Sequence, residues 1–156
     1  MFLPRVASGP DRGRHASPLG LLRSGLGEGP EVRNQTILVV DDEFLIRFMV
    51  SDVLREAGYH VVEACDGDEG LTMLQSGQTI DLIVTDVRMP GAIDGMELTR
   101  RSKALDPSRR VIVCSGHLRP EESGPADAFL AKPYSVEALL QIAKLLLGKT
   151  PQPRLV

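Results

Sequence analysis

The chain has 156 residues, 42% of them hydrophobic and 25% charged, a composition that suits one globular domain with a sizeable core and leaves no room for a second. No apolar run approaches the roughly 18 residues of a membrane-spanning helix, and no signal-peptide pattern opens the chain, so we expect a cytoplasmic protein with no membrane span. The net charge of −3 divides into +2 for residues 1–34 and −5 for residues 35–156, and this acidic balance disfavours direct binding of nucleic acid.

Composition divides the chain into three regions. Residues 1–34 are rich in Gly, Pro, Ser and Arg without sustained periodicity, which predicts a disordered tail. Residues 35–150 form the predicted folded domain, and residues 151–156 form a short C-terminal tail. Cys65 and Cys114 lie far apart, with no Cys or His at metal-binding spacing, so we expect two reduced thiols with structural roles.

From Thr36 onward, short apolar runs alternate with helical patterns. The predicted strands, in chain order, are residues 36–40, 60–64, 81–86, 111–115 and 128–131. The predicted helices between and after them are residues 43–58, 68–76, 95–105 and 136–148. In the first of these helices Leu45, Phe48, Met49, Val53 and Ala57 recur at helical spacing, and Gly58 ends the pattern.

The predicted strands are apolar throughout rather than alternating. Such strands need cover on both faces, which a parallel sheet with helices on each side provides. The sequence therefore predicts an α/β fold with a doubly wound, five-stranded parallel sheet. In folds of this kind, sites form at the carboxyl ends of the strands, beside the switch in strand order.

Polar side chains stand at four of the predicted strand ends: Asp41 and Asp42, Asp86, Ser115, and Lys132. A single aspartate in such a place is usually a helix cap or a turn former, but the combination is more informative. Carboxylates gathered at one edge repel one another, which implies a bound cation, and hard oxygen ligands in an incomplete cage suit Mg²⁺. The lysine and the hydroxyl complete a pocket for a phosphoryl group.

The motifs VVDDE, DLIVTDVRMPG followed by DG, VIVCSG and FLAKPY, in this order, resemble the receiver domain of two-component response regulators, of the stand-alone type with a flavodoxin-like fold. The resemblance covers roughly residues 35–148. It implies that Asp86 accepts a phosphoryl group from a phosphohistidine of a sensor histidine kinase or histidine phosphotransfer protein. It also implies that Asp42, Asp86 and the backbone carbonyl of Arg88 bind Mg²⁺, with Asp41 holding the metal through water.

The same resemblance implies roles for residues near the ends of the last two strands. Ser115 matches the hydroxyl that bonds the phosphoryl group, and Lys132 matches the lysine that neutralises it. Phe129 matches the aromatic residue that changes position on activation, although its place in an apolar run also suits plain core packing. The bond between Lys132 and Pro133 is expected to be cis.

Two connections depart from the family pattern. Between Ser115 and Lys132 the chain is short and is interrupted by Pro120, Gly124 and Pro125, which predicts a fourth helix that is short or absent. The loop MPGAIDG carries one residue more than usual. We expect residues 116–127 to be mobile without phosphate and their ordering to signal to a downstream protein target.

Other classes fit less well. A haloacid-dehalogenase type of enzyme needs a second acid two residues after Asp86, where this chain has Arg88, and a nucleotide-binding module needs a glycine-rich loop after the first strand. A non-phosphorylated interaction module on the same fold remains as the alternative. Because few residues follow Gly148, we expect either a stand-alone receiver or a fragment of a longer protein.

Overall fold

The computed structural model of the protein describes residues 34–148. Apart from Asn34, the tails predicted at residues 1–34 and 151–156 lie outside the described residues. Within residues 34–148, each helix is too short or too polar to cross a membrane.

The order of the elements follows the prediction. The described elements are β1 (Thr36–Val40), α1 (Phe44–Glu56), β2 (His60–Ala64), α2 (Gly67–Gln75), β3 (Leu82–Asp86), α3 (Gly95–Leu105), β4 (Arg110–Ser115), a 3₁₀ turn (Pro120–Glu122), β5 (Ala128–Ala131) and α4 (Val136–Leu147). The predicted bounds differ from these by at most two residues at either end, which is the usual uncertainty of element ends.

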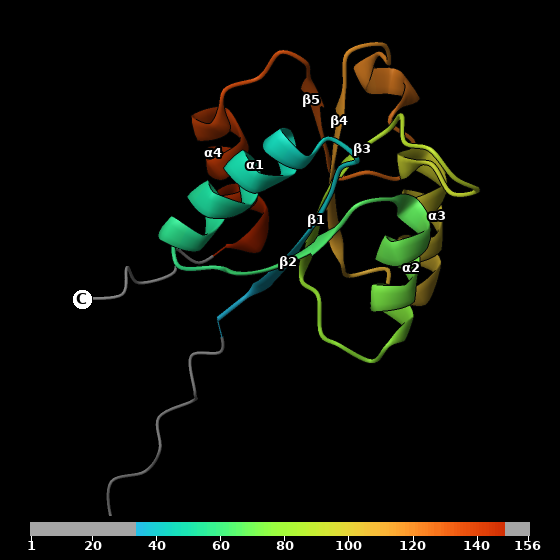
Figure 1. Ribbon diagram of the computed structural model, residues 1–156, viewed down its shortest axis with the longest axis horizontal. Helices are drawn as coiled ribbons and strands as arrows, with labels where there is room; N and C mark the ends of the chain where they lie inside the picture. Colours follow the sequence, from blue (N-terminus) through green and yellow to red (C-terminus); the bar gives the residue numbers. More distant parts are fainter. Residues whose placement is uncertain (1–33, 149–156) are drawn as a thin grey trace, which may run out of the picture. The chain divides into compact units, whose positions relative to one another are not determined.

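The strands form one parallel sheet in the order β2-β1-β3-β4-β5. Helices α1 and α4 cover one face of it, and α2 and α3 cover the other (Figure 1). The predicted doubly wound α/β fold with helices on both faces is therefore confirmed. The change in chain direction across the sheet falls between β1 and β3, where a site is expected in folds of this kind.

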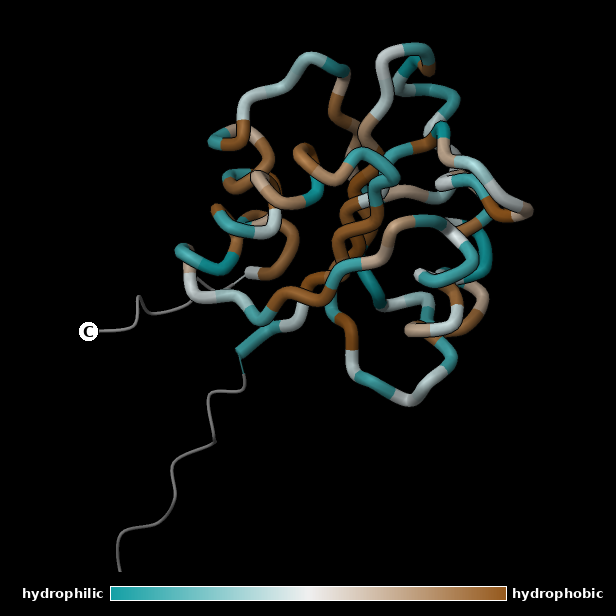
Figure 2. The backbone as a smooth tube through the Cα atoms, viewed as in Figure 1, coloured by the Kyte–Doolittle hydropathy of each residue, from teal (hydrophilic) through white to brown (hydrophobic). Residues whose placement is uncertain are grey.

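Alternate strand residues supply two separate core layers. Ile37 and Val39 face the layer beneath α1 and α4, whereas Leu38 and Val40 face the layer beneath α2 and α3. All four side chains are at most 2% exposed. The strands appear as a hydrophobic band through the centre of the molecule (Figure 2). Burial on both faces explains why these strands read as continuous apolar runs.

Helix α1 buries a different face from the one that its sequence pattern emphasises. Val50 and Leu54 pack into the core and are 4% and 1% exposed. Of the five residues whose spacing indicates the helix, Leu45, Phe48 and Met49 are 69%, 50% and 52% exposed, whereas Ala57 packs against the core. The periodicity therefore predicts the helix correctly without identifying which side of it meets the sheet.

The connection between β4 and β5 contains no full helix, as predicted. Its only helical part within the described chain is the 3₁₀ turn at Pro120–Glu122, and Gly124 has a positive φ of 58°. Leu118 and Ala126 pack against the core layer beneath α2 and α3. The segment 116–127 thus lies against the sheet through a few apolar side chains.

The loop after β3 is held by two carboxylates near the start of α3. The Asp68 carboxylate at the start of α2 accepts a hydrogen bond from the Ala92 amide at 3.2 Å, and the Asp94 carboxylate caps α3 by accepting from the Glu97 amide at 2.8 Å. Gly95 follows directly, and a Cβ atom there would overlap the backbone carbonyl of Asp86. The first turn of α3 can approach the end of β3 only because residue 95 has no side chain.

Replacing Gly95 by alanine should lower the free energy of unfolding by ~2 kcal/mol, because the added methyl group forces α3 away from the end of β3. The control is Gly116→Ala, where the nearest heavy atom to an added Cβ is the Cβ of Lys132 at an ordinary 3.7 Å. Urea unfolding followed by circular dichroism compares the two. Equal transition midpoints for both variants would contradict the close approach of α3 to β3.

Candidate functional site

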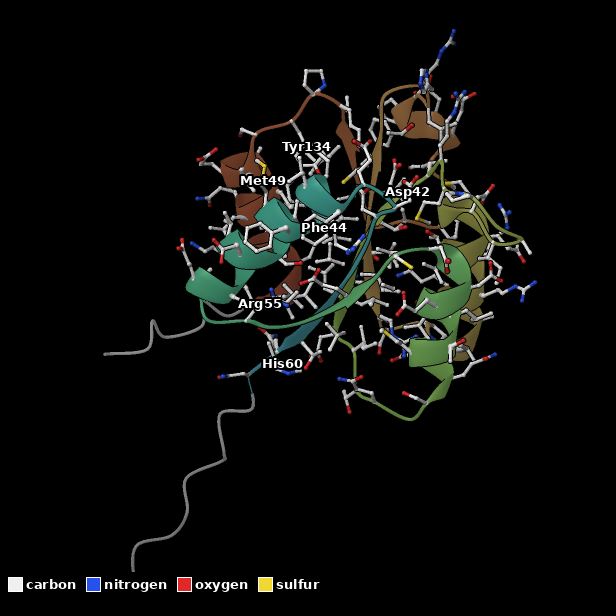
Figure 3. The ribbon with its side chains drawn as sticks, viewed as in Figure 1. Asp42, Phe44, Met49, Arg55, His60 and Tyr134 are labelled. Atoms are coloured by element: carbon white, nitrogen blue, oxygen red, sulfur yellow. The ribbon has the colours of Figure 1, made fainter. Side chains whose placement is uncertain are left out.

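The carboxyl ends of four strands bring the predicted site residues to one edge of the sheet. Asp41 follows β1, Asp86 ends β3, Ser115 ends β4 and Lys132 follows β5. Figure 3 shows Asp42 at this edge, beyond the end of β1. Because all the strands run parallel, their carboxyl ends meet there, and this places residues far apart in sequence beside one another.

Three carboxylates form the centre of the site. Asp41, Asp42 and Asp86 each offer an oxygen, and these oxygens lie within 4.8 Å of one another. Within residues 34–148 this is the one group of acids, histidines or cysteines compact enough to hold a metal ion. Asp41 is buried, with 5% exposure, whereas Asp42 is exposed and Asp86 is half-buried. The donor set, made of hard oxygen atoms and partly open to solvent, suits a Mg²⁺ ion that keeps some of its water.

Lys132 is the cation nearest to these acids in the described chain. Its Nζ atom lies 3.3 Å from Oδ1 of Asp86 and 3.9 Å from Oδ2 of Asp41. The backbone amide of Lys132 donates to the carbonyl of Ser115 at 2.9 Å, and the bond to Pro133 is cis, as predicted. The position of Lys132 is thus set by a main-chain hydrogen bond to β4 and by the attraction between its ammonium group and the two carboxylates.

Burial and charge act in opposite directions on the site's ionisable groups. Burial raises the pKa of the Asp41 carboxyl, and the charges of Asp86 and Asp42 add to this, while the Glu43 amide and Lys132 oppose it. Burial alone would lower the pKa of Lys132, but the carboxylates of Asp86 and Asp41 outweigh it and raise that pKa. Lys132 therefore stays positively charged at neutral pH, and three acids share this one nearby lysine.

Asp86 is oriented through one of its two carboxylate oxygens. Oδ1 accepts a hydrogen bond from the Val87 amide at 2.8 Å and faces Lys132. Thr85 donates its hydroxyl to the backbone carbonyl of Asp86, also at 2.8 Å. Within residues 34–148, the Val87 amide and Lys132 both contact Oδ1, and no hydrogen bond to Oδ2 is found.

Ser115 and Phe129 occupy different positions relative to the acids. Ser115 is 2% exposed, and its Oγ atom accepts hydrogen bonds from the amides of His117 and Leu118, both at 3.1 Å. Phe129 is half-buried on the face beneath α2 and α3. In the sheet it pairs with Val113, two residues before Ser115.

Arg88 lies in the turn after β3 and is exposed. It lines an open hollow of about 570 Å³ together with Asp42, Met89 and Asp94. The backbone carbonyl of Arg88, which the sequence predicts as a Mg²⁺ ligand, therefore belongs to a turn that borders the same hollow as Asp42.

A second, more apolar cavity lies beside the site, and sequence reasoning did not identify it. It measures about 430 Å³ and is lined by side chains of α1, including Ile46 and Met49, and by Pro133, Tyr134 and Val136. Glu43 and Lys132 contribute its charged part. Figure 3 shows Met49 and Tyr134 on this side of the molecule. The cavity forms where α1 meets the chain after β5, a contact that local sequence patterns do not encode.

Sequence reasoning also missed Arg47, whose side chain reaches back from α1 to the backbone of Asp41. The only signal in the sequence is that an arginine follows the acid pair at the fifth position after Asp42. Cys114, in contrast, fits its predicted structural role, because burial raises the pKa of its thiol to about 12. Cys65 is exposed, and both cysteines are free thiols.

Comparison with known proteins identifies the family. The model of the response regulator receiver domain matches residues 37–144. Sporulation initiation phosphotransferase F of Bacillus subtilis is 29% identical over 116 residues, which cover 71% of this chain and 92% of the relative. The response regulator receiver protein CpdR of Brucella abortus is 35% identical over 118 residues, which cover 72% and 96% of the two chains.

A solved structure gives the same result. The response regulator protein TrrA of Thermotoga maritima, in complex with Mg²⁺ and BeF, matches with a TM-score of 0.66 and 34% identity. The match covers 72% of this chain and 99% of the TrrA chain. The chain therefore belongs to the family of response regulator receiver domains.

Proposed function

We propose that Asp86 accepts a phosphoryl group from a phosphohistidine of a partner protein and that this modification changes which proteins the chain binds. As a receiver domain, the chain is a phosphorylation-based signalling module. The observation that carries the assignment to Asp86 is its position at a fixed strand end, within 4.8 Å of two other acids and 3.3 Å from the ammonium group of Lys132.

The proposed step is a nucleophilic displacement at phosphorus. A carboxylate oxygen of Asp86 forms a bond to phosphorus while the bond between phosphorus and the partner's imidazole nitrogen breaks. The imidazole keeps the electron pair of that bond and takes up a proton. Since phosphoryl transfer goes through a loose, in-line transition state, the protein acts mainly by positioning and by stabilising charge.

The donor set fits Mg²⁺. Asp42, Asp86 and the backbone carbonyl of Arg88 would hold the ion, with Asp41 acting through water. When bound, Mg²⁺ supplies positive charge next to the oxygens of the transferring group. The TrrA structure, with its Mg²⁺ and BeF, supports this assignment by similarity.

Lys132 and Ser115 complete the proposed machinery. Lys132 neutralises part of the charge on the phosphoryl oxygens. The hydroxyl of Ser115 donates a hydrogen bond to one of these oxygens, and any movement toward them strains its two hydrogen bonds from the amides of His117 and Leu118. Phe129 then shifts into space that the moving loop leaves, so modification of Asp86 reaches the segment 116–127.

That segment is the proposed output surface. Without a helix between β4 and β5, it has few packing contacts to resist rearrangement. It also exposes the acidic pair Glu121 and Glu122, which favours a basic patch on the downstream protein target.

The exposed side of α1 is the proposed docking surface for the phosphohistidine partner. We call it the α1 apolar band, formed by Phe44, Leu45, Phe48 and Met49. The rings of Phe44 and Phe48 stack with their centroids 6.1 Å apart. An exposed apolar band on a helix is typical of a surface that packs against another protein.

The position of this band favours a helix of a sensor histidine kinase or a histidine phosphotransfer protein as the partner. Met49 belongs both to the band and to the apolar cavity that Lys132 borders. A helix lying along the band would therefore bring a histidine side chain toward Asp86. We place this exchange in the cytoplasm, in keeping with two free thiols in the protein.

Replacing Asp86 by asparagine should abolish phosphorylation, because the amide is a poor nucleophile and removes one metal-binding charge. The wild type and the variant are incubated with Mg²⁺ and acetyl phosphate, and the phosphate adduct is measured by intact mass. Asp52→Asn, a change at an exposed acid of α1, is the matched control and should be labelled like the wild type. An undiminished adduct in Asp86→Asn would assign the reaction elsewhere, and a wild type without any adduct would favour a non-phosphorylated interaction module.

Changing Phe48 and Met49 together to alanine should slow phosphoryl transfer from a sensor kinase by ~10-fold or more, because the partner loses central apolar contacts. Labelling by acetyl phosphate should be unchanged, since the acids are intact. Leu105→Ala is the control, a 51% exposed apolar residue at the end of α3, on the opposite face of the sheet. The kinase for this experiment is chosen from a panel of sensor histidine kinases as the one that phosphorylates the wild type fastest. Equal transfer rates for all three proteins would exclude the α1 apolar band as the docking surface.

Residues 116–127 should exchange their amide hydrogens faster than the neighbouring β4 strand in the unmodified protein and should slow when beryllofluoride and Mg²⁺ are added. The reason is that hydrogen bonding of Ser115 to the phosphoryl mimic orders the loop that follows it. The Asp86→Asn protein with the same additions is the control and should not change. Strong protection of residues 116–127 before the addition, unaltered afterwards, would mean that the signal leaves by another surface.

A further inference from the structure

Arg47 is a nearly buried cation directly beneath the acidic loop, and its side chain is 14% exposed. Its Nη1 atom donates to the backbone carbonyl of Asp41 at 2.6 Å. Its Nε atom lies 3.3 Å from Oε2 of Glu63, on the neighbouring strand β2. The guanidinium group also lies 5.7 Å from the centroid of the Phe44 ring. A single planar group thus joins the loop, the edge strand and the start of α1.

The carbonyl that Arg47 holds belongs to the peptide between Asp41 and Asp42. Residues 41–43 lie between β1 and α1 and have no regular secondary structure, so sheet and helix hydrogen bonds do not fix this peptide throughout. The amide of Asp41 donates to Ala64 at 3.3 Å, and the amide of Glu43 donates to Oδ1 of Asp41 at 2.9 Å. A short hydrogen bond from a charged donor is the stronger kind and limits rotation of the peptide plane.

We propose that Arg47 is a positioning residue, which holds the Asp41–Asp42 peptide in the orientation that lets these two carboxylates converge with Asp86 on Mg²⁺. This inference rests on the proposed metal site. It adds an outer contact that sets the geometry of the acids through their backbone, in the way that groups behind metal ligands commonly do. Within the described residues, the polar and ring contacts of the Arg47 side chain reach the Asp41 carbonyl, Glu63 and Phe44, and none reaches a carboxylate of the three acids.

Arg55 is the control that distinguishes a positioning role of Arg47 from a purely structural link between α1 and β2. It also projects from α1 to Glu63, with Nη2 at 2.8 Å from Oε1, but the described structure gives it no contact with Asp41. If the pair of arginines only ties α1 to β2, loss of either should have the same effect on stability and on metal binding. If Arg47 positions the acids, only its loss should weaken Mg²⁺ binding.

The shape of the guanidinium group matters as well as its charge. Arg47 reaches the Asp41 carbonyl and Glu63 through different nitrogen atoms of one rigid fork. A lysine has a single ammonium group on a flexible stem and cannot reproduce both contacts in the same plane. Arg47→Lys should therefore recover only part of the metal affinity.

The test compares Arg47→Met, Arg47→Lys and Arg55→Met with the wild type. Methionine keeps an unbranched stem against Phe44 and removes the charge. Mg²⁺ binding is measured by titration calorimetry, and melting temperatures are measured in the presence of a chelator. We expect Mg²⁺ to bind ~10-fold more weakly to Arg47→Met. Arg47→Lys should show an intermediate loss, and Arg55→Met should bind Mg²⁺ like the wild type.

A metal-free measurement gives the second readout. The Glu43 amide, which hydrogen-bonds to the carboxylate of Asp41, should exchange faster by NMR in Arg47→Met than in Arg55→Met. This difference should persist after correction for any difference in melting temperature. Arg47→Lys keeps the charge and most of the stem, so it provides the comparison if Arg47→Met does not fold.

The outcomes separate this inference from the proposed function. A wild type that binds Mg²⁺, with Arg47→Met or Arg47→Lys binding as tightly, would overturn the role of Arg47 and leave the metal site standing. Equal weakening by the Arg47 and Arg55 changes would also overturn it, because the effect would then come from the link to Glu63. If the wild type binds Mg²⁺ no better than the Asp42→Asn variant does, the metal site and the role of Arg47 are both overturned.

Discussion

Repulsion among three carboxylates at one edge of the sheet is the constraint around which the rest of the structure is arranged. Asp41, Asp42 and Asp86 bring oxygens within 4.8 Å of one another, and Lys132 offsets only part of their charge. Without a cation such a cluster destabilises the folded state. The strand ends must therefore be held by contacts that do not involve the acids. The two core layers supply these contacts, because the strand residues just before Asp41 and Asp86 are almost completely buried.

Helix α1 shows how one element serves the site in several ways. Val50 and Leu54 anchor it to the sheet, and Arg47 reaches from the same helix to the backbone of the acidic loop. Its opposite side carries the α1 apolar band. Because the helix starts two residues after Asp42, a partner bound to this band would lie close to the acids. The helix therefore links the proposed docking surface to the acids that are proposed to hold the metal.

On the β4–β5 side of the site, the chain has less regular secondary structure and fewer packing contacts. The β4–β5 connection has only a 3₁₀ turn, and Phe129 on β5 remains half-buried. Ser115 ends β4, and its hydroxyl oxygen already accepts hydrogen bonds from the amides of His117 and Leu118, near the start of the segment 116–127. A region with few packing contacts rearranges at low cost, which makes it suited to respond to a small change at a strand end. The rigid side of the site thus positions the acids, and the less rigid side is free to change.

The sequence by itself determined the strands, their parallel arrangement and the residues at their ends. Strands buried on both faces must be apolar throughout, and the carboxyl ends of parallel strands must meet at one edge, so Asp41, Asp86 and Lys132 were predictable neighbours. The shortened connection after Ser115 was also predictable, because Pro120 and Pro125 interrupt any helix there. Only the tertiary structure decided which face of α1 is exposed, that Arg47 bonds the Asp41 carbonyl, and that a cavity opens beside Tyr134. These features depend on how elements distant in the chain pack together, and local periodicity carries no information about that packing.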